Sequence, residues 1–294
     1  MKNIIKFLSF LSCLLGCLHS SAQNTLQGNM KRFEKEMSRD SWPRDTLDYA
    51  FLNVHYRQSV RENKLIPDKL TESDMVLQIG NEKSKYVNYK ILISDSIMAE
   101  ELKQLELSML QVLNGALMRT KKAGDRSELI KNYPKGQYWV RMPVLLDRYV
   151  YTETKPTFDW TFASDTLTVL GYLCKKATCS FRGRDYTAWY APDIPLSNGP
   201  WKFNGLPGLI LKVEDADRDY SFECTALYRV DWKSPIYLSK RKKDIETTRE
   251  KFRQAEKAAM NNPNAVIGNS GLVTVPKGEK IVTKILPYNP IELE

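Results

Sequence analysis

The order of apolar and polar residues divides the chain into many strand-like segments and two helix-like ones. β-branched and aromatic residues are concentrated in segments bounded by turn residues, which is typical of strands. Most neighbouring segments are separated by short connections, and a parallel crossover needs a dozen or more residues, so we expect antiparallel pairing. The predicted strands are 48–56, 74–80, 86–93, 137–144, 148–152, 166–180, 185–191, 209–214 and 220–230.

The period of the pattern changes between Ser96 and Gly124. Apolar residues recur there at spacings of four, three, four and three, so they share one face of a helix. These residues are Met98, Leu102, Leu105, Met109 and Val112. We expect one helix, capped by Asp95 or Ser96, whose apolar face packs on the sheet.

A second helix is predicted over 239–260, where charged residues dominate. Such a segment is typical of a solvated helix face, and a docking face for an acidic partner is the alternative. The tail from residue 261 onward is rich in Pro and Gly, with one strand predicted at 280–286.

These elements predict an α+β fold. We expect a single domain with a curved, mainly antiparallel β-sheet, similar in outline to an open half-barrel, and two substantial helices. The domain boundaries follow from composition: residues 1–22 as a signal peptide, 23–47 as a polar lead-in and 48–294 as the folded α+β domain.

The first 22 residues have the features of an export signal. Lys2 and Lys6 precede an apolar segment, Phe7–Leu18, and Ser20–Ala22 supplies the small residues of a cleavage site. The apolar segment is shorter than the roughly 20 residues that span a membrane. We therefore expect export to the periplasm or outer envelope of a Gram-negative bacterium, with release outside the cell as the alternative, and no transmembrane segment.

A lipoprotein signal is a second interpretation of the same segment. Leu14-Leu15-Gly16-Cys17 has the form of a lipidation box with Cys17 as the modified residue, although the Ser-Ser-Ala-Gln end favours simple cleavage. The net charge of +9 is a separate observation. An exported basic protein meets lipid head groups and acidic polysaccharides, so no nucleic-acid partner is expected.

Few histidines limit the chemistry of the chain. Only His19 and His55 are present, and cleavage removes His19. Neither a nucleophile–base pair, a zinc-ligand spacing, a phosphate-binding loop nor a dinucleotide fingerprint occurs, so no catalytic residue, metal or cofactor is predicted. A carboxylate-based hydrolase is the alternative that the sequence leaves open. Acidic residues near aromatic ones are Asp193, Glu214, Asp215 and Glu223.

Three cysteines remain after cleavage, namely Cys174, Cys179 and Cys224. An oxidising compartment favours disulfides. Cys174 and Cys179 are five residues apart, so on a regular strand they point to opposite faces. Pairing of either one with Cys224 is one hypothesis, and three unpaired buried thiols is the other.

The segment 183–215 is the densest in aromatic residues, Gly and Pro. Pro207 and Gly208 predict a type II turn that leads into the strand 209–213. Aromatic residues around a fixed loop either fill the core or line a cleft. The ligand-binding candidates are Tyr186, Trp189, Tyr190, Trp201 and Phe203.

The hexapeptide Gly205-Leu206-Pro207-Gly208-Leu209-Ile210 resembles the motif that names the GLPGLI family of exported Bacteroidota proteins. Gly171-Tyr172, Ala188–Tyr190 and Tyr288-Asn289-Pro290 are similar to the flanking pattern of that family. The resemblance implies an envelope location and no known activity. We therefore expect non-catalytic binding of a hydrophobic ligand, a peptide or an envelope protein. The alternative is an assembly role through the basic helix 239–260.

Overall fold

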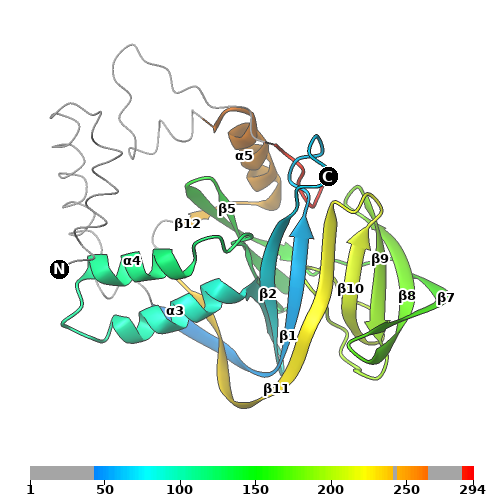
Figure 1. Cartoon of the computed structure of the whole chain (residues 1–294), viewed down its shortest axis with the longest axis horizontal. Coiled ribbons are helices and arrows are strands. Elements are labelled where there is room, and N and C mark those ends of the chain that lie inside the picture. Colours follow the sequence, from blue (N-terminus) through cyan, green and yellow to red (C-terminus); the bar gives the residue numbers. More distant parts are fainter. Residues whose placement is uncertain (1–42, 241–243, 264–286) are drawn as a thin grey trace.

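The chain forms one large sheet, which the computed structural model describes for residues 43–240, 244–263 and 287–294 (Figure 1). The predicted signal peptide, Cys17 and the strand predicted at 280–286 lie outside these ranges. In the described part, twelve strands follow the order β12-β6-β5-β4-β3-β2-β1-β11-β10-β9-β8-β7. Each neighbouring pair is antiparallel except β12 and β6, which are parallel, so the sheet is mixed.

The strands differ widely in length. β1 and β11, which pair at the centre of the sheet, are the longest. The bounds are β1 Arg44–Val60, β2 Thr71–Gly80, β3 Ser84–Asn88, β4 Glu128–Lys131, β5 Gln137–Val144, β6 Asp147–Thr154, β7 Thr161–Val169, β8 Tyr172–Phe181, β9 Arg184–Ala191, β10 Leu209–Asp215, β11 Tyr220–Ser239 and β12 Asp244–Glu246. The helices are α3 Tyr89–Glu101, α4 Met109–Arg119 and α5 Arg249–Asn261.

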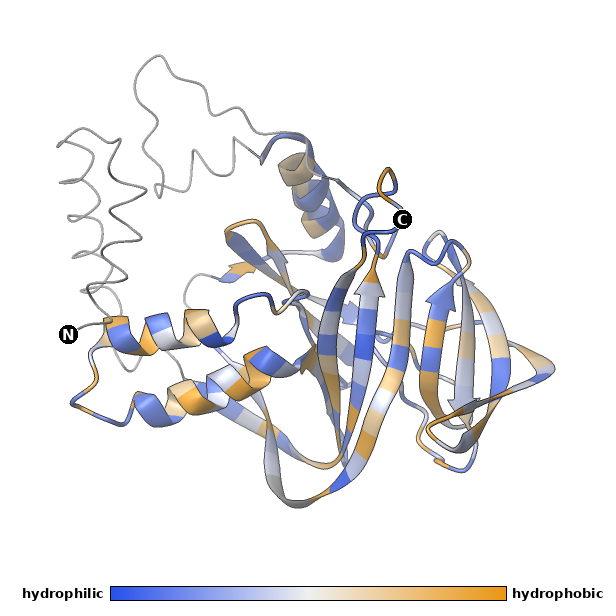
Figure 2. Ribbon diagram, in the orientation of Figure 1, coloured by the Kyte–Doolittle hydropathy of each residue, from blue (hydrophilic) through white to orange (hydrophobic). Residues whose placement is uncertain are grey.

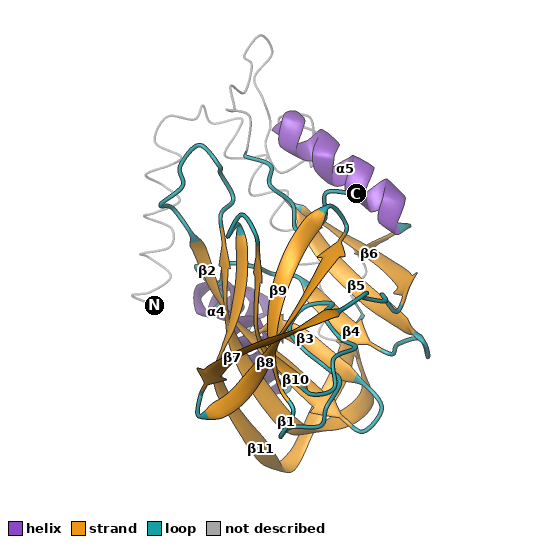
Figure 3. Cartoon of the chain, turned by 90° about the vertical axis from the view of Figure 1, so that its right-hand side faces the viewer, coloured by secondary structure: helices purple, strands orange, loops and turns teal. Residues whose placement is uncertain are grey.

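The predicted α+β class with two substantial helices is wrong: the described part of the chain is mostly β, with three short helices. α3 and α4 lie side by side, and α5 packs on β6 (Figures 1 and 3). Figure 3 also shows the sheet curving between α4 and α5. In the described strand order, β12 and β7 stand at opposite ends and do not pair, so the sheet is open.

The long helix predicted after Ser96 is two helices, because two caps define other start points. The Asn88 side chain accepts hydrogen bonds from the backbone of Lys90 and Ile91, so α3 begins where a strand was predicted to continue. Ser108 forms a capping box with Gln111 and starts α4. The helix predicted over 239–260 is also shorter, since Ser239 still pairs with Arg44 in the sheet.

The main core lies on one face of the sheet, and smaller buried clusters lie on the other. Along β1, Ala50, Leu52, Val54 and Tyr56 are buried, whereas Phe51, between Ala50 and Leu52, is 40% exposed. This period of two is visible as alternating colours along the strands in Figure 2.

The predicted strand 166–180 is a hairpin, with β7 and β8 on either side of the turn at Leu170 and Gly171. The three cysteines are buried free thiols.

The type II turn predicted at Pro207 and Gly208 does not form. Such a turn needs φ near +80° at Gly208, where the value is 158°. The Leu209 N–H donates to the Ile194 carbonyl at 2.9 Å instead of closing the turn. Glycine is required here by close approach, because a Cβ at Gly208 would lie 2.3 Å from the Ala191 carbonyl oxygen.

Gly208→Ala is therefore expected to destabilise the fold by about 3 kcal/mol, since backbone atoms must move apart. Gly136→Ala is the matched control. Gly136 has φ of 78° and nothing within 4 Å of an added Cβ, so only backbone strain of about 1 kcal/mol arises. Urea unfolding of both variants measures the difference, and equal losses would contradict the close-approach argument.

Candidate functional site

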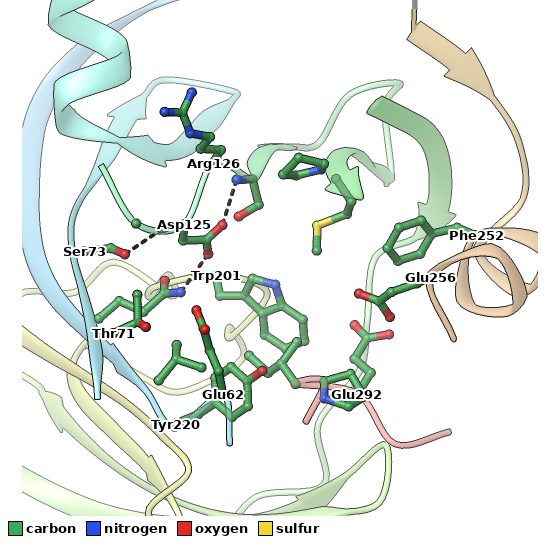
Figure 4. A pocket seen from close by; sticks show the side chains of 18 of the residues that line it. Glu62, Thr71, Ser73, Asp125, Arg126, Trp201, Tyr220, Phe252, Glu256 and Glu292 are labelled. Carbon is green, nitrogen blue, oxygen red and sulfur yellow. Dashed lines mark hydrogen bonds between the residues drawn. The ribbon is translucent and has the colours of Figure 1, made fainter. Parts of the chain in front are cut away.

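A cleft of about 400 Å³ opens where the ends of β1 and β2 meet the β5–β6 turn, α5 and the C-terminal segment (Figure 4). Its wall mixes apolar, aromatic and charged side chains. The residues that line it include Gln58, Glu62, Thr71, Ser73, Asp125, Arg126, Ser127, Met142, Leu145, Trp201, Lys202, Tyr220, Phe252, Arg253, Glu256, Pro290, Ile291 and Glu292. Residues from widely separated segments of the sequence thus meet at one place.

Trp201 lies between two groups of carboxylates in the cleft. Figure 4 shows Asp125 on one side of its ring and Glu256 and Glu292 on the other. Its backbone has φ of 43°, in the left-handed region that a bulky residue rarely adopts. Strain of this kind costs about 1–3 kcal/mol and is concentrated at functional sites.

Lys131 of β4 fixes the loop that carries Trp201. Its Nζ donates to Asn198 Oδ1 at 2.9 Å, to the Gly199 carbonyl at 2.8 Å and to the Phe203 carbonyl at 3.1 Å. Burial lowers the pKa of Lys131 well below its ordinary value, because a charged amine is poorly solvated there. The three hydrogen bonds of Lys131 Nζ anchor the loop on both sides of Trp201.

A buried ionic cluster adjoins the cleft and includes two of its lining residues, Lys202 and Glu292. Lys202 Nζ lies 2.5 Å from both Glu153 Oε1 and Glu292 Oε1. Arg182 contacts the same two carboxylates at 2.6 Å, and Arg249 lies 2.7 Å from Glu292. Burial alone would raise the pKa of Glu292, but Lys202, Arg182 and Arg249 outweigh it and lower the pKa to about 2. We call these five residues the Glu292 cluster.

The opposite wall of the cleft is held by neutral donors. Asp125 accepts from Gln58 Nε2 and from the Ser127 backbone N–H, both at 2.7 Å. The Asp125 backbone N–H donates to Ser73 Oγ at 2.7 Å. Gln58 is in turn oriented by Tyr86, whose hydroxyl donates to Gln58 Oε1 at 3.0 Å. These contacts position one carboxylate opposite Trp201.

Glu256 of α5 differs from Glu292 in the direction of its pKa shift. It accepts from Tyr288 Oη at 3.0 Å and from Arg253 Nη1 at 2.8 Å. Burial nevertheless raises the pKa of Glu256 above its ordinary value. Two carboxylates of one cleft thus have pKa values shifted in opposite directions, an arrangement that can divide acid and base roles.

The ligand-binding candidates from the sequence do not gather at this cleft. Trp201 lines it and is itself largely buried, with 5% of its surface exposed. Tyr186, Tyr190 and Phe203 are buried in the core and do not line the cleft, and Trp189 is half-buried on β9. The sequence pattern did not predict the lining residues that distant segments contribute, namely Asp125, Tyr220, Phe252, Glu256 and Glu292. The motif Tyr288-Asn289-Pro290 lies next to Glu292 and could have indicated that the C-terminal segment forms part of the site.

His55 does not line the cleft, and neither do the acidic candidates from the sequence, Asp193, Glu214, Asp215 and Glu223. His55 Nε2 is 2.8 Å from the Tyr228 hydroxyl, on a strand face away from the cleft lining. In the described ranges, no three His, Cys, Asp or Glu side chains gather as a metal site requires. None of the helices described is long and apolar enough to cross a membrane.

Comparison with known proteins gives a short family match and distant structural matches. A family model described as "Protein of unknown function (Porph_ging)" matches residues 182–212, which include the hexapeptide 205–210. No curated protein matches the chain. A structure of PNGF-II in space group P21 is similar with 16% identity and a TM-score of 0.46, over 72% of this chain and 34% of that one. A second PNGF-II structure, in space group C2, gives 15%, 0.45, 72% and 33%. The chain thus spans about a third of the length of either PNGF-II chain.

Glu292→Gln tests the ionic cluster. The folded-state pKa of Glu292 lies below its ordinary value of 4.5. Its contribution to the free energy of unfolding is therefore complete above about pH 5 and is lost as the pH falls toward 2. We expect the variant to be about 3 kcal/mol less stable at pH 7, and this gap to narrow between pH 5 and pH 2. Urea unfolding over that range measures it.

Glu100→Gln is the control, since the Glu100 side chain is 69% exposed and pairs with Lys103 on the surface of α3. We expect a change within about 0.5 kcal/mol at every pH. A stability gap for Glu292→Gln that stays constant down to pH 2 would contradict the assigned charge of Glu292.

Proposed function

We propose that the chain is an exported, non-catalytic envelope protein of the GLPGLI type that binds an extended peptide in the cleft around Trp201. The observation that carries this proposal is Trp201 itself, a strained aromatic residue fixed by Lys131 in an amphipathic cleft. Strain that the surrounding structure maintains at an accessible pocket is typical of a binding residue. The periplasmic side of the envelope, reached through the signal peptide, is part of the proposal.

The lining favours a peptide over an acyl chain. Asp125, Glu256 and Arg126 border the apolar groups of Trp201 and Phe252. An acyl chain would cover these charged groups with apolar surface and offer them no hydrogen bond in place of water, which is unfavourable. A peptide offers amides that bond to the polar wall and side chains that pack on the apolar one. The cleft volume lies within the range of ordinary ligand pockets.

The position of α5 argues against assembly through a basic helix. Arg249 pairs with Glu292 and Arg253 with Glu256, so half of the basic side chains of this helix are engaged in ion pairs with carboxylates that line the cleft. Lys251 and Lys257 remain exposed on α5. Two separated charges on α5 form a weaker docking face for an acidic partner than the continuous basic helix that was predicted over 239–260.

Selection from a displayed library of random peptides tests the proposal. We expect wild-type protein to enrich peptides that bind it, and Trp201→Leu to weaken their binding about tenfold or more, since a central aromatic anchor is worth about 2 kcal/mol. Trp189→Leu is the control, because Trp189 is half-buried outside the cleft. Circular dichroism checks that both variants are folded. Enriched peptides that bind all three proteins equally would refute the proposal.

Carboxylate-based hydrolysis is a second candidate, favoured by the opposite pKa directions of Glu256 and Glu292. Under this candidate, peptides or glycans incubated with the protein are cleaved, and Glu256→Gln abolishes turnover while binding persists. Mass spectrometry of the substrates before and after incubation measures it. Enriched peptides that remain intact after prolonged incubation with wild-type protein would count against it and in favour of binding alone.

A further inference from the structure

The C-terminal segment Tyr288–Glu294 is held in the way that receptors hold peptides. Side chains bind three successive backbone carbonyls: Tyr220 Oη donates to Asn289 O at 2.6 Å, Arg184 Nη2 to Pro290 O at 2.8 Å and Tyr186 Oη to Ile291 O at 3.2 Å. A backbone bond from Leu293 N–H to the Arg182 carbonyl, at 2.9 Å, joins the far end. Recognition of carbonyls by side chains differs from the backbone ladder of an added strand.

The surface also recognises the side chain of Asn289. Its Oδ1 accepts from Arg184 Nη2 at 2.7 Å, and its Nδ2 donates to the Arg61 carbonyl at 2.7 Å. Arg184 is itself fixed by Asp215 at 2.6 Å and by Asp219 at 3.2 Å, and it is buried. The guanidinium is therefore already oriented by the sheet, independently of the C-terminal segment.

The third element of recognition is the charge of Glu292. Without this carboxylate, the Glu292 cluster would retain three cations, Lys202, Arg182 and Arg249, against the single anion Glu153. An excess of buried positive charge is strongly unfavourable. The surface therefore requires a carboxylate three residues after the asparagine.

We infer that the surface beneath residues 289–292 is a recognition site for an acidic peptide of the pattern Asn-Pro-x-Glu, occupied in this structure by the chain's own C-terminal segment. A peptide of this pattern from another polypeptide binds there when that segment is removed. This inference goes beyond the proposed function: Pro290, Ile291 and Glu292 form a wall of the cleft, so a peptide bound in their place borders the cleft and does not fill it.

The tethered segment explains why an intact chain is not expected to bind this peptide. A covalently attached ligand acts at an effective concentration in the millimolar range. A free peptide of moderate affinity cannot compete at that level. Removal of the segment is therefore the condition under which the site becomes measurable.

The experiment uses the full chain shortened to residue 286 and a fluorescently labelled octapeptide with the sequence of 287–294. Anisotropy should show saturable one-to-one binding to the shortened chain and none to the intact chain. An octapeptide carrying Glu292→Gln should bind at least tenfold more weakly. Glu294→Gln is the matched control and should bind within twofold, because the contact of Arg249 is with the Glu294 main-chain oxygen. No binding to a folded shortened chain, or equal binding of both variants, overturns the inference.

A second measurement applies if the shortened chain does not fold. A specific protease site placed before Pro287 in the intact chain allows cleavage after folding. Native mass spectrometry should then show the octapeptide retained and exchanging with an excess of isotope-labelled octapeptide. Loss of the octapeptide without rebinding, or a bound octapeptide that never exchanges, overturns the inference.

The outcomes separate this inference from the proposed function. Octapeptide binding without Trp201-dependent library peptides supports the C-terminal site and refutes the wider proposal. Library peptides that bind through Trp201, together with an octapeptide that does not bind, support the proposed function and refute the C-terminal site.

Discussion

The contacts of Glu292 with Lys202, Arg182 and Arg249 are the constraint on which the rest of the site depends. They join the loop of Trp201, the β8–β9 turn, α5 and the C-terminal segment through one buried carboxylate. Buried charges tolerate no missing partner, so these four segments must adopt one arrangement together. A cleft formed from segments so distant in sequence obtains its shape from this charge balance more than from any single element.

Most strands could be predicted from the sequence because their pattern is local, whereas β4 was not predicted and β12 lies in a segment that was expected to be helical. The alternation along β1 and the boundary at Gly80 both follow from residues within a few positions. Helix starts were missed because one capping side chain decides them: Asn88 ends β3 and starts α3 in what looks like a continuous apolar segment. The apolar spacing at Met98–Val112 predicted one continuous helix, but Leu105, one of its apolar positions, is 84% exposed between α3 and α4, and the spacing could not reveal the new start at Ser108.

The site was less predictable, for a different physical reason. Trp201 stood out by composition, yet its role depends on Lys131, which is 70 positions away and anchors the loop through carbonyl groups that no sequence pattern marks. Asp125 and Glu256 are ordinary acidic residues until the fold brings them to opposite sides of one ring. Aromatic density predicted the core as much as the cleft, since Tyr186 and Phe203 fill the interior.

The location of Glu292 also sets the order of events when the chain is made. Lys202 and Arg182 emerge during synthesis long before Glu292, so for most of that time the cluster lacks one of its anions. The sheet can form early, but the cleft is completed only when the segment that carries Glu292 arrives. Loss of residues 287–294 alone would leave every described strand and helix in the chain and still remove one wall of the cleft, so the fold and the site can be lost separately.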